Sequence, residues 1–171
     1  MGTGIVVTSG KGGTGKTAFT CGVGAALARL GRRTLCLDMD VGLRNLDLAL
    51  GMTDRGVMDF TDVIFHRTPL ERAAVPHPTE ENLYLLTAPM SWGEDEVLPC
   101  HMEELLDRIR ETFDYCLIDC PAGIGGGFHL AVCAADRAVV VVNTDEASVR
   151  DAQQVRDELH DWGLQIGRAH V

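Results

Sequence analysis

The chain has two lysines, Lys11 and Lys16, and both lie in one glycine-rich segment from Gly10 to Thr17 with the sequence GKGGTGKT. The other 13 of the 15 basic residues are arginines. A lysine ammonium is a compact point charge that suits a phosphate group. The segment satisfies the pattern G-x-x-x-x-G-K-[ST], whose glycines let successive backbone amides surround phosphate. It predicts a phosphate-binding loop in which Lys16 holds the β- and γ-phosphates and Thr17 holds Mg²⁺.

Acidic residues at the ends of two apolar runs form a second set of candidates. The run 115–119 (YCLID) ends in Asp119, which is the pattern of a Walker B strand and could complete the Mg²⁺ site. An Asp at the end of a strand is more often a turn former, so this prediction depends on the phosphate loop. Asp38 and Asp40 end another apolar run and could face the metal or the attacking water.

The segment after Asp119 is predicted to form a turn whose backbone senses the γ-phosphate. Together these patterns predict a nucleotide site that binds Mg²⁺ beside the phosphates, and the residues facing this Mg²⁺ are called the metal-side residues. The predicted metal-side residues are Thr17, Asp38 and Asp119. The predicted nucleotide-binding residues are Gly10, Lys11, Gly12, Gly13, Thr14, Gly15, Lys16, Thr17, Ala18, Pro121 and Gly123.

The surrounding sequence predicts an α/β fold that can position these residues. Five apolar runs have the character of strands covered on both faces: residues 4–9, 34–38, 83–87, 115–119 and 138–143. Apolar residues at helical spacing predict helices over residues 16–30, 101–113 and 146–162, with short helices over 59–66 and 69–74. This alternation predicts a mostly parallel sheet with helices on both faces.

Composition narrows the classes of protein that fit. The 171 residues suit one domain, and 25 acidic against 15 basic residues give a net charge of -10. This charge disfavours binding of nucleic acid or of an anionic membrane through the body of the protein. The longest apolar stretches have strand length, the N-terminus lacks a secretory pattern, and the six cysteines form no C-x-x-C pair. We therefore expect a cytoplasmic protein with buried free thiols and no nucleic-acid partner.

Residues 11–17 resemble the deviant Walker A motif of the MinD/ParA family of ATPases. Residues 38–47 (DMDVGLRNLD) are similar to switch I of the MinD branch, residues 119–124 (DCPAGI) to its switch II, and residues 148–151 (SVRD) also look MinD-like. The resemblance runs from about residue 4 to residue 160. It implies a P-loop NTPase fold with ATP and Mg²⁺ as cofactors.

The resemblance also implies an ATP hydrolase that forms a face-to-face homodimer on ATP. Lys11 of each subunit would then contact phosphate in the other subunit's site, as an arginine finger does. Asp40 would orient the attacking water with help from Asn45, so the implied catalytic residues are Lys11, Lys16, Asp40 and Asn45. Such proteins bind the inner face of the cell membrane through a C-terminal helix, position the division septum, and act with division-inhibitor and activator proteins of the Min system.

The chain departs from the family pattern in several places. Gly125 stands where the MinD branch usually carries Glu, so the response of switch II to an activator is in question. Family members continue well beyond this length, through the adenine-contacting loop and the membrane helix. Residues 166–171 (IGRAHV) match the translation of a common sequencing-library adapter. We therefore expect residues 1–164 to be the N-terminal portion of an incomplete ATPase domain and residues 165–171 to be a non-native tail, and the shortened chain could be inactive.

Two alternative functions stay open. One is a ParA-like partition ATPase or a flagellar-number regulator, although the net charge of -10 and the GLRNLD segment argue against a DNA-bound partition ATPase. The other is a shortened nucleotide-binding module that does not hydrolyse ATP. Residues 143–146 (NTDE) lack the lysine of a guanine-reading N-K-x-D motif, so the sequence gives no support for GTP.

Overall fold

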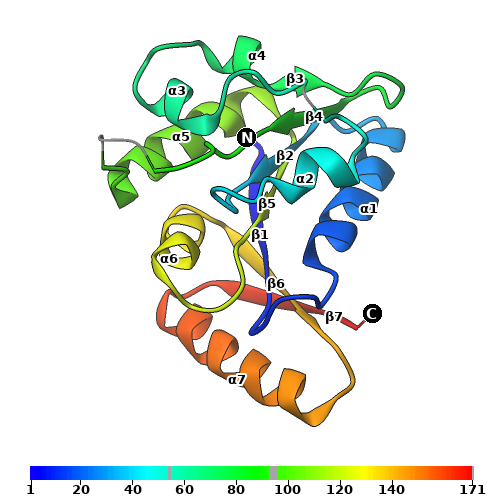
Figure 1. The fold of residues 1–171 in the computed structure, drawn as a ribbon, viewed down its shortest axis with the longest axis vertical. Coiled ribbons are helices and arrows are strands. Elements are labelled where there is room, and N and C mark those ends of the chain that lie inside the picture. The colour runs from blue at the N-terminus through cyan, green and yellow to red at the C-terminus, as the bar shows by residue number, and fades with distance from the viewer. Residues whose placement is uncertain (54, 93–95, 171) are drawn as a thin grey trace.

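In the residues that the structure describes, which are 1–53, 55–92 and 96–170 of a computed structural model, a seven-stranded sheet lies at the centre (Figure 1). Its order is β3-β4-β2-β5-β1-β6-β7. The neighbouring strands are parallel, except that β3 runs antiparallel to β4. The strands are β1 Thr3–Thr8, β2 Thr34–Asp38, β3 Val75–Pro76, β4 Leu83–Leu86, β5 Tyr115–Asp119, β6 Arg137–Val142 and β7 Gln165–His170.

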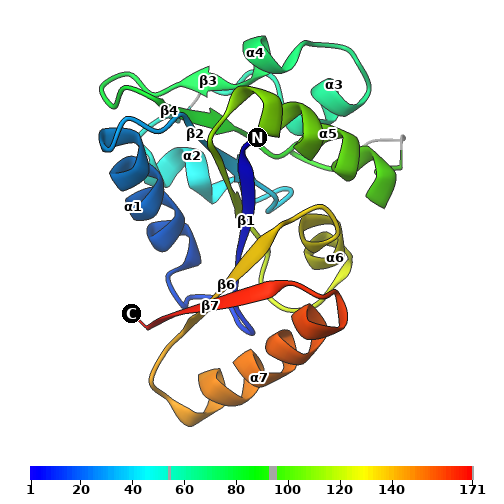
Figure 2. The ribbon, with the colours of Figure 1, turned by 180° about the vertical axis from the view of Figure 1, so that it is seen from behind.

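Helices cover both faces of the sheet, as Figures 1 and 2 show from opposite sides. They are α1 Lys16–Arg29, α2 Asn45–Ala49, α3 Phe60–Ile64, α4 Leu70–Ala73, α5 Pro99–Thr112, α6 Gly126–Val132 and α7 Glu146–Asp161. On one face, α1 and α2 share a core that includes Cys36 and Leu117 of the sheet. On the other face, α5, α6 and α7 cover a larger core that includes Ile118 and Val140. The predicted α/β class, with a mostly parallel sheet and helices on both faces, is confirmed.

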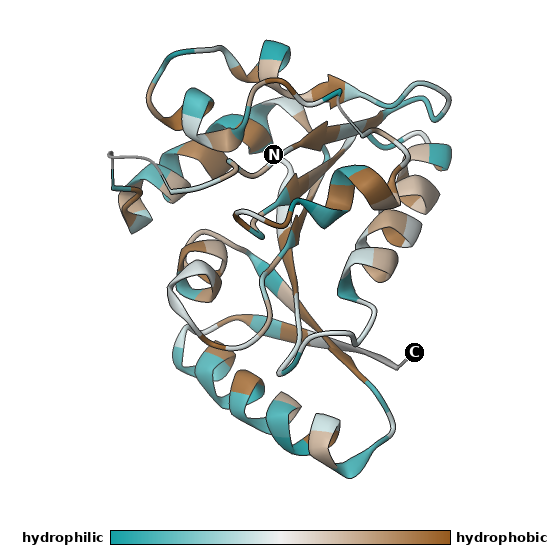
Figure 3. Cartoon of the chain, in the orientation of Figure 1, coloured by the Kyte–Doolittle hydropathy of each residue, from teal (hydrophilic) through white to brown (hydrophobic). Residues whose placement is uncertain are grey.

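The strands that lead into the site are largely apolar, as their colour in Figure 3 shows. Most residues of β1 and β5 are buried. Every residue of β2 is buried, because the strand lies inside the sheet and both of its faces are covered. In the parallel register, Asp38 of β2 lies opposite Asp119 of β5, and Asp119 lies opposite Val7 of β1. The carboxyl ends of these three strands therefore meet at one edge of the sheet, where the predicted site residues follow them.

Four elements are missing from the sequence prediction: α2, β3, α6 and β7. α2 has five residues and β3 has two, so neither is long enough to show a hydrophobic period. α6 begins with Gly126 and Gly127, and glycine disfavours helix. Residues 165–170 form β7 and pair in parallel with β6. The non-native origin of residues 165–171 stays a prediction that the coding DNA can test, and Val171 lies outside the described residues.

No helix in the described part of the chain combines the length and the apolar character that crossing a membrane requires.

The cysteines are free thiols, as expected. Cys36, Cys116 and Cys120 are buried, but Cys100 is exposed at the start of α5. The expectation of buried thiols therefore holds for only part of the set.

Candidate functional site

The glycine-rich segment forms a loop between β1 and α1 with open backbone donors. Gly13 and Gly15 have φ angles of 73° and 93°, a left-handed conformation that glycine adopts because it has no Cβ. No side chain caps α1 and no acidic residue lies in its first turn. Within the described chain, the backbone amides of residues 11–18 make no hydrogen bond, and the amide of Phe19 is the first with a partner. Free amides at the positive end of a helix favour an anionic ligand.

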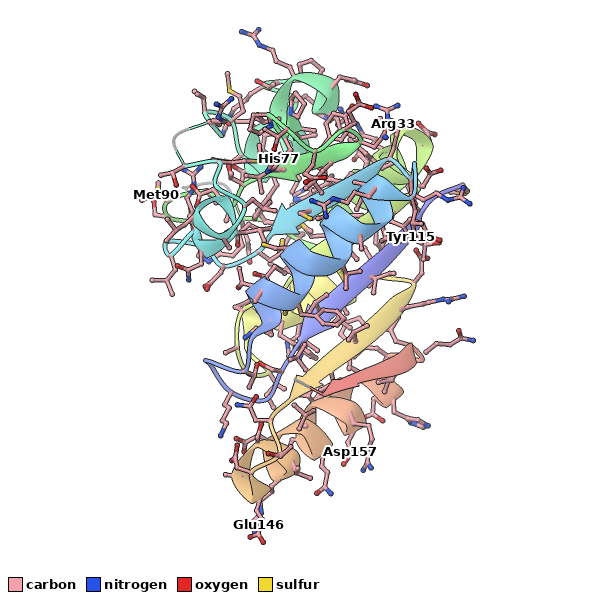
Figure 4. All side chains as sticks on the ribbon, turned by 90° about the vertical axis from the view of Figure 1, so that its right-hand side faces the viewer. Arg33, His77, Met90, Tyr115, Glu146 and Asp157 are labelled. Carbon is pink, nitrogen blue, oxygen red and sulfur yellow. The ribbon has the colours of Figure 1, made fainter. Side chains whose placement is uncertain are left out.

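Gly10 and Lys11 belong to this loop and contact α7 and its N-cap residue. Figure 4 shows the loop beside the first turn of that helix. A Cβ on Gly10 would lie 2.4 Å from the backbone carbonyl carbon of Asp151, so no side chain fits there. Lys11 Nζ donates to the two carboxylate oxygens of Asp145 at 3.0 and 3.3 Å. Asp145 also caps α7 by accepting from the amide of Ser148 at 2.9 Å. The cap and then the Lys11 contact lower the pKa of Asp145.

Asp119, the last residue of β5, faces the first turns of α1. Thr17 Oγ1 donates to Asp119 Oδ2 at 2.7 Å, and Thr20 Oγ1 donates to Asp119 Oδ1 at 3.3 Å. Burial raises the pKa of Asp119, while the Thr17 hydrogen bond and the Lys16 charge act in the opposite direction. The structure therefore brings two of the predicted metal-side residues, Thr17 and Asp119, into direct contact.

Asp38 holds the loop that follows β2. Its Oδ1 accepts from the amide of Asp40 at 2.8 Å, and its Oδ2 accepts from the amide of Leu46 at 3.2 Å. These bonds favour the ionised carboxylate, but burial outweighs them and raises the pKa of Asp38 to about 7. Burial also raises the pKa of Asp40, and the Lys16 charge opposes that shift. Asp38 thus fixes both ends of the switch I loop, and its role toward a metal stays a prediction.

The other predicted residues lie in or beside these loops. Asn45 is exposed at the start of α2. The amide of Gly123 donates to the carbonyl oxygen of Ser9 at 3.2 Å, which ties the switch II segment to the phosphate loop. Pro121 is half-buried. Thr14 is buried, and its hydroxyl has no hydrogen-bond partner in the described part of the chain.

Two contacts of the site are missing from the sequence prediction: Thr20 with Asp119, and Asp145 with Lys11. A signal existed for each of them. Thr17 and Thr20 are three residues apart on one helix and therefore share a face, and an Asp directly before a helix predicts an N-cap. Neither signal identifies the partner, which lies 99 residues away for Thr20 and 134 residues away for Asp145.

The donor set fits Mg²⁺ together with phosphate. Among the described residues, no group of three or more His, Cys, Asp or Glu side chains could hold a metal ion. A metal at this edge would therefore take further ligands from another molecule, and Mg²⁺ commonly binds through one or two protein oxygens plus phosphate and water. The Thr17 hydroxyl and the Asp119 carboxylate are such oxygens. A Cβ on Gly12 or Gly13 would meet nothing within 4 Å, so the loop beside them is open.

Comparison with known sequences identifies relatives along most of the chain. Residues 2–162 match the family model AAA_31, described as an AAA domain. Septum site-determining protein MinD of Synechocystis sp. is 45% identical over 151 residues, which are 88% of this chain and 57% of the relative. MinD of Bacillus subtilis is 41% identical over 156 residues, which are 91% of this chain and 58% of the relative. The chain thus spans less than two thirds of the length of these relatives.

Solved structures agree with the sequence matches. The MinC:MinD cell division protein complex of Aquifex aeolicus contains a chain with a TM-score of 0.89 and 39% identity, covering 98% of this chain and 68% of that one. MinD of Pyrococcus horikoshii complexed with Mg-ADP has a TM-score of 0.86 and 33% identity, covering 98% of this chain and 69% of that one. The chain therefore belongs to the MinD branch of the MinD/ParA family of P-loop ATPases.

Proposed function

We propose that the full-length protein binds Mg-ATP and hydrolyses it. The observation that carries this proposal is the open set of loop amides beside the Thr17–Asp119 pair, where the hydroxyl and the carboxylate oxygen are 2.7 Å apart. Amides suit the phosphates, and the two side-chain oxygens suit Mg²⁺. The Mg-ADP complex of the related Pyrococcus horikoshii protein supports the same assignment.

Each residue of this site has its own role in the proposed binding and hydrolysis of ATP. Lys16 holds the β- and γ-phosphates, and Thr17 and Asp119 hold the metal side. Mg²⁺ supplies neutralisation of the charge that develops on the phosphate oxygens. Asp40 orients the attacking water with help from Asn45, and Asp38 keeps Asp40 in place by accepting a hydrogen bond of 2.8 Å from its backbone amide.

We further propose that ATP produces a homodimer in which Lys11 of one subunit contacts phosphate in the other. In this cycle the ATP dimer rests on the inner face of the cell membrane and hydrolysis returns it to the cytoplasm, so that the protein helps to position the division septum. Relatives with the name septum site-determining protein support this role, and the MinC:MinD complex supports a division-inhibitor partner. An activator protein of the Min system and a membrane-binding C-terminal helix complete the proposal.

The substitution Lys16→Ala in the full-length protein tests nucleotide binding. It removes charge-assisted phosphate contacts of about 1.5 to 3 kcal/mol each, so ATP affinity should fall tenfold or more. Arg29→Ala is the matched control, because it removes one positive charge from the exposed end of the same helix, where Arg29 pairs with Glu80. Calorimetric titration of ATP with both variants makes the comparison.

Hydrolysis is measured on the same protein with and without anionic vesicles. We expect turnover in the unsubstituted protein, a higher rate with vesicles, and none in Lys16→Ala. ATP affinity that is the same in Lys16→Ala and Arg29→Ala would contradict the proposal. Stoichiometric binding without turnover would instead favour a nucleotide-binding module.

A further inference from the structure

Thr20 is a fully buried threonine on α1, one helical turn beyond Thr17. The residue is 0% exposed, so it lies in the protein interior and not on the surface that would face a ligand. A threonine inside a helix commonly returns its hydroxyl to the carbonyl four residues earlier. The Thr20 hydroxyl instead donates to Asp119 Oδ1 at 3.3 Å, across the boundary between α1 and β5.

Thr17 and Thr20 together engage both oxygens of the Asp119 carboxylate. Thr17 Oγ1 lies 2.7 Å from Oδ2, and Thr20 Oγ1 lies 3.3 Å from Oδ1. With the Thr17 bond alone, the carboxylate could still turn about its terminal torsion, which is soft. Because both hydroxyls come from one helix, they fix the carboxylate plane relative to α1 and to the phosphate loop at its start.

We propose that Thr20 is a positioning residue for the metal side of the nucleotide site, holding Asp119 in the orientation that bound Mg²⁺ requires. It does so through the carboxylate and without touching metal or nucleotide. This inference rests on the proposed Mg-nucleotide binding. Groups that orient metal-side ligands typically change metal affinity by about 10- to 100-fold when they are removed. Binding of nucleotide without metal depends on the loop amides and on Lys16, so Thr20 should leave it unchanged.

Three substitutions in the full-length protein separate this role from ordinary packing. Thr20→Val keeps the branched shape and removes the hydroxyl, whereas Thr20→Ser keeps the hydroxyl. Thr34→Val is the matched control, because Thr34 is also 0% exposed and its hydroxyl donates to the Arg32 carbonyl oxygen at 3.0 Å, at the opposite end of the sheet. The probe is a fluorescent ADP analogue, titrated without Mg²⁺ and at a series of Mg²⁺ concentrations.

For Thr20→Val we expect the half-saturating Mg²⁺ concentration to rise about tenfold or more, with metal-free affinity for the ADP analogue within about twofold of the unsubstituted protein. Thr20→Ser should restore the Mg²⁺ dependence, and Thr34→Val should not change it. An unchanged Mg²⁺ dependence in Thr20→Val would overturn the inference while leaving the proposed function intact. An equal loss of affinity with and without Mg²⁺ would also overturn it, because that result indicates a packing role. If the unsubstituted protein shows no Mg²⁺-dependent binding, the proposed function itself fails.

Discussion

At the scale of single residues, Asp38 couples folding to pH. Its carboxyl has a pKa of about 7 in the folded chain, above the value of about 3.9 in an unfolded chain. The folded state therefore binds a proton that the unfolded state has released between these two values. Stability from this group is complete below about pH 4 and is lost as the pH rises through about 7. We expect the free energy of unfolding of the nucleotide-free, magnesium-free protein to fall across this interval.

Asp38→Asn removes this titration and keeps the size of the side chain. Urea unfolding of both proteins from pH 4.5 to pH 8 measures the effect. The pKa values of Asp40 and Asp119 are also raised, but both proteins contain these residues, so the difference between the two stability curves reports Asp38. The unsubstituted protein should lose stability relative to Asp38→Asn as the pH rises, by an amount on the order of a few kcal/mol. Two stability curves that stay parallel over this range would contradict the assigned cause.

The sequence predicts the residues of the site better than it predicts their partners. Lys16 and Thr17 are predictable because the phosphate loop is a local motif with a fixed backbone requirement. Asp119 follows from the apolar run before it. The bonds of Asp119 to Thr20 and of Lys11 to Asp145 are not predictable from patterns, because the fold brings together residues 99 and 134 positions apart.

At the scale of elements, α1 can lie against the sheet because Gly24 has no side chain. A Cβ at this position would lie 2.7 Å from Cys36 Sγ on β2, where the thiol is buried. Gly24→Ala should therefore destabilise the protein by about 1 to 3 kcal/mol through overpacking. Gly22→Ala on the same helix should stabilise it by about 0.5 to 1 kcal/mol, because its Cβ would meet nothing within 4 Å and alanine favours helix.

Chemical denaturation of the two alanine variants checks this contrast. The order of their midpoints is the decisive result, since both substitutions raise helix propensity equally and differ only in the space available. If Gly24→Ala unfolds at the same urea concentration as Gly22→Ala, then α1 does not depend on close contact at Gly24.

The success of element prediction depended on length. α1, α5 and α7 have 14 to 16 residues. Apolar residues recur at helical spacing along α5 and α7, whereas the buried residues of α1 are Thr20, Gly24 and Ala28, and that helix follows instead from the phosphate loop before it. The central strands were predictable because burial on both faces demands continuous apolar runs. α2 and α6 have five and seven residues and owe their helical form to neighbouring loops and packing rather than to periodicity.

At the scale of the whole molecule, the proposed action of Lys11 on a second subunit requires its side chain to give up the contact with Asp145. In the single chain it pairs with Asp145, and the two side chains are 36% and 50% exposed. Water and salt screen such a pair, so phosphate of a nucleotide held by another subunit can compete for the ammonium. The ATP dimer would then replace a contact within the chain by one between chains.

Mixing two inactive full-length variants tests this exchange. Lys11→Ala lacks the residue supplied to the partner, and Asp40→Ala lacks the residue that orients water in its own site. In a mixed dimer, the site on the Lys11→Ala subunit keeps its own Asp40 and receives Lys11 from the other subunit. Equal mixing should recover about a quarter of the unsubstituted ATPase rate, since about half of the dimers are mixed and each has one intact site of two. If Lys11 acted only within its own subunit, each mixed dimer would contain two defective sites and the mixture would stay inactive.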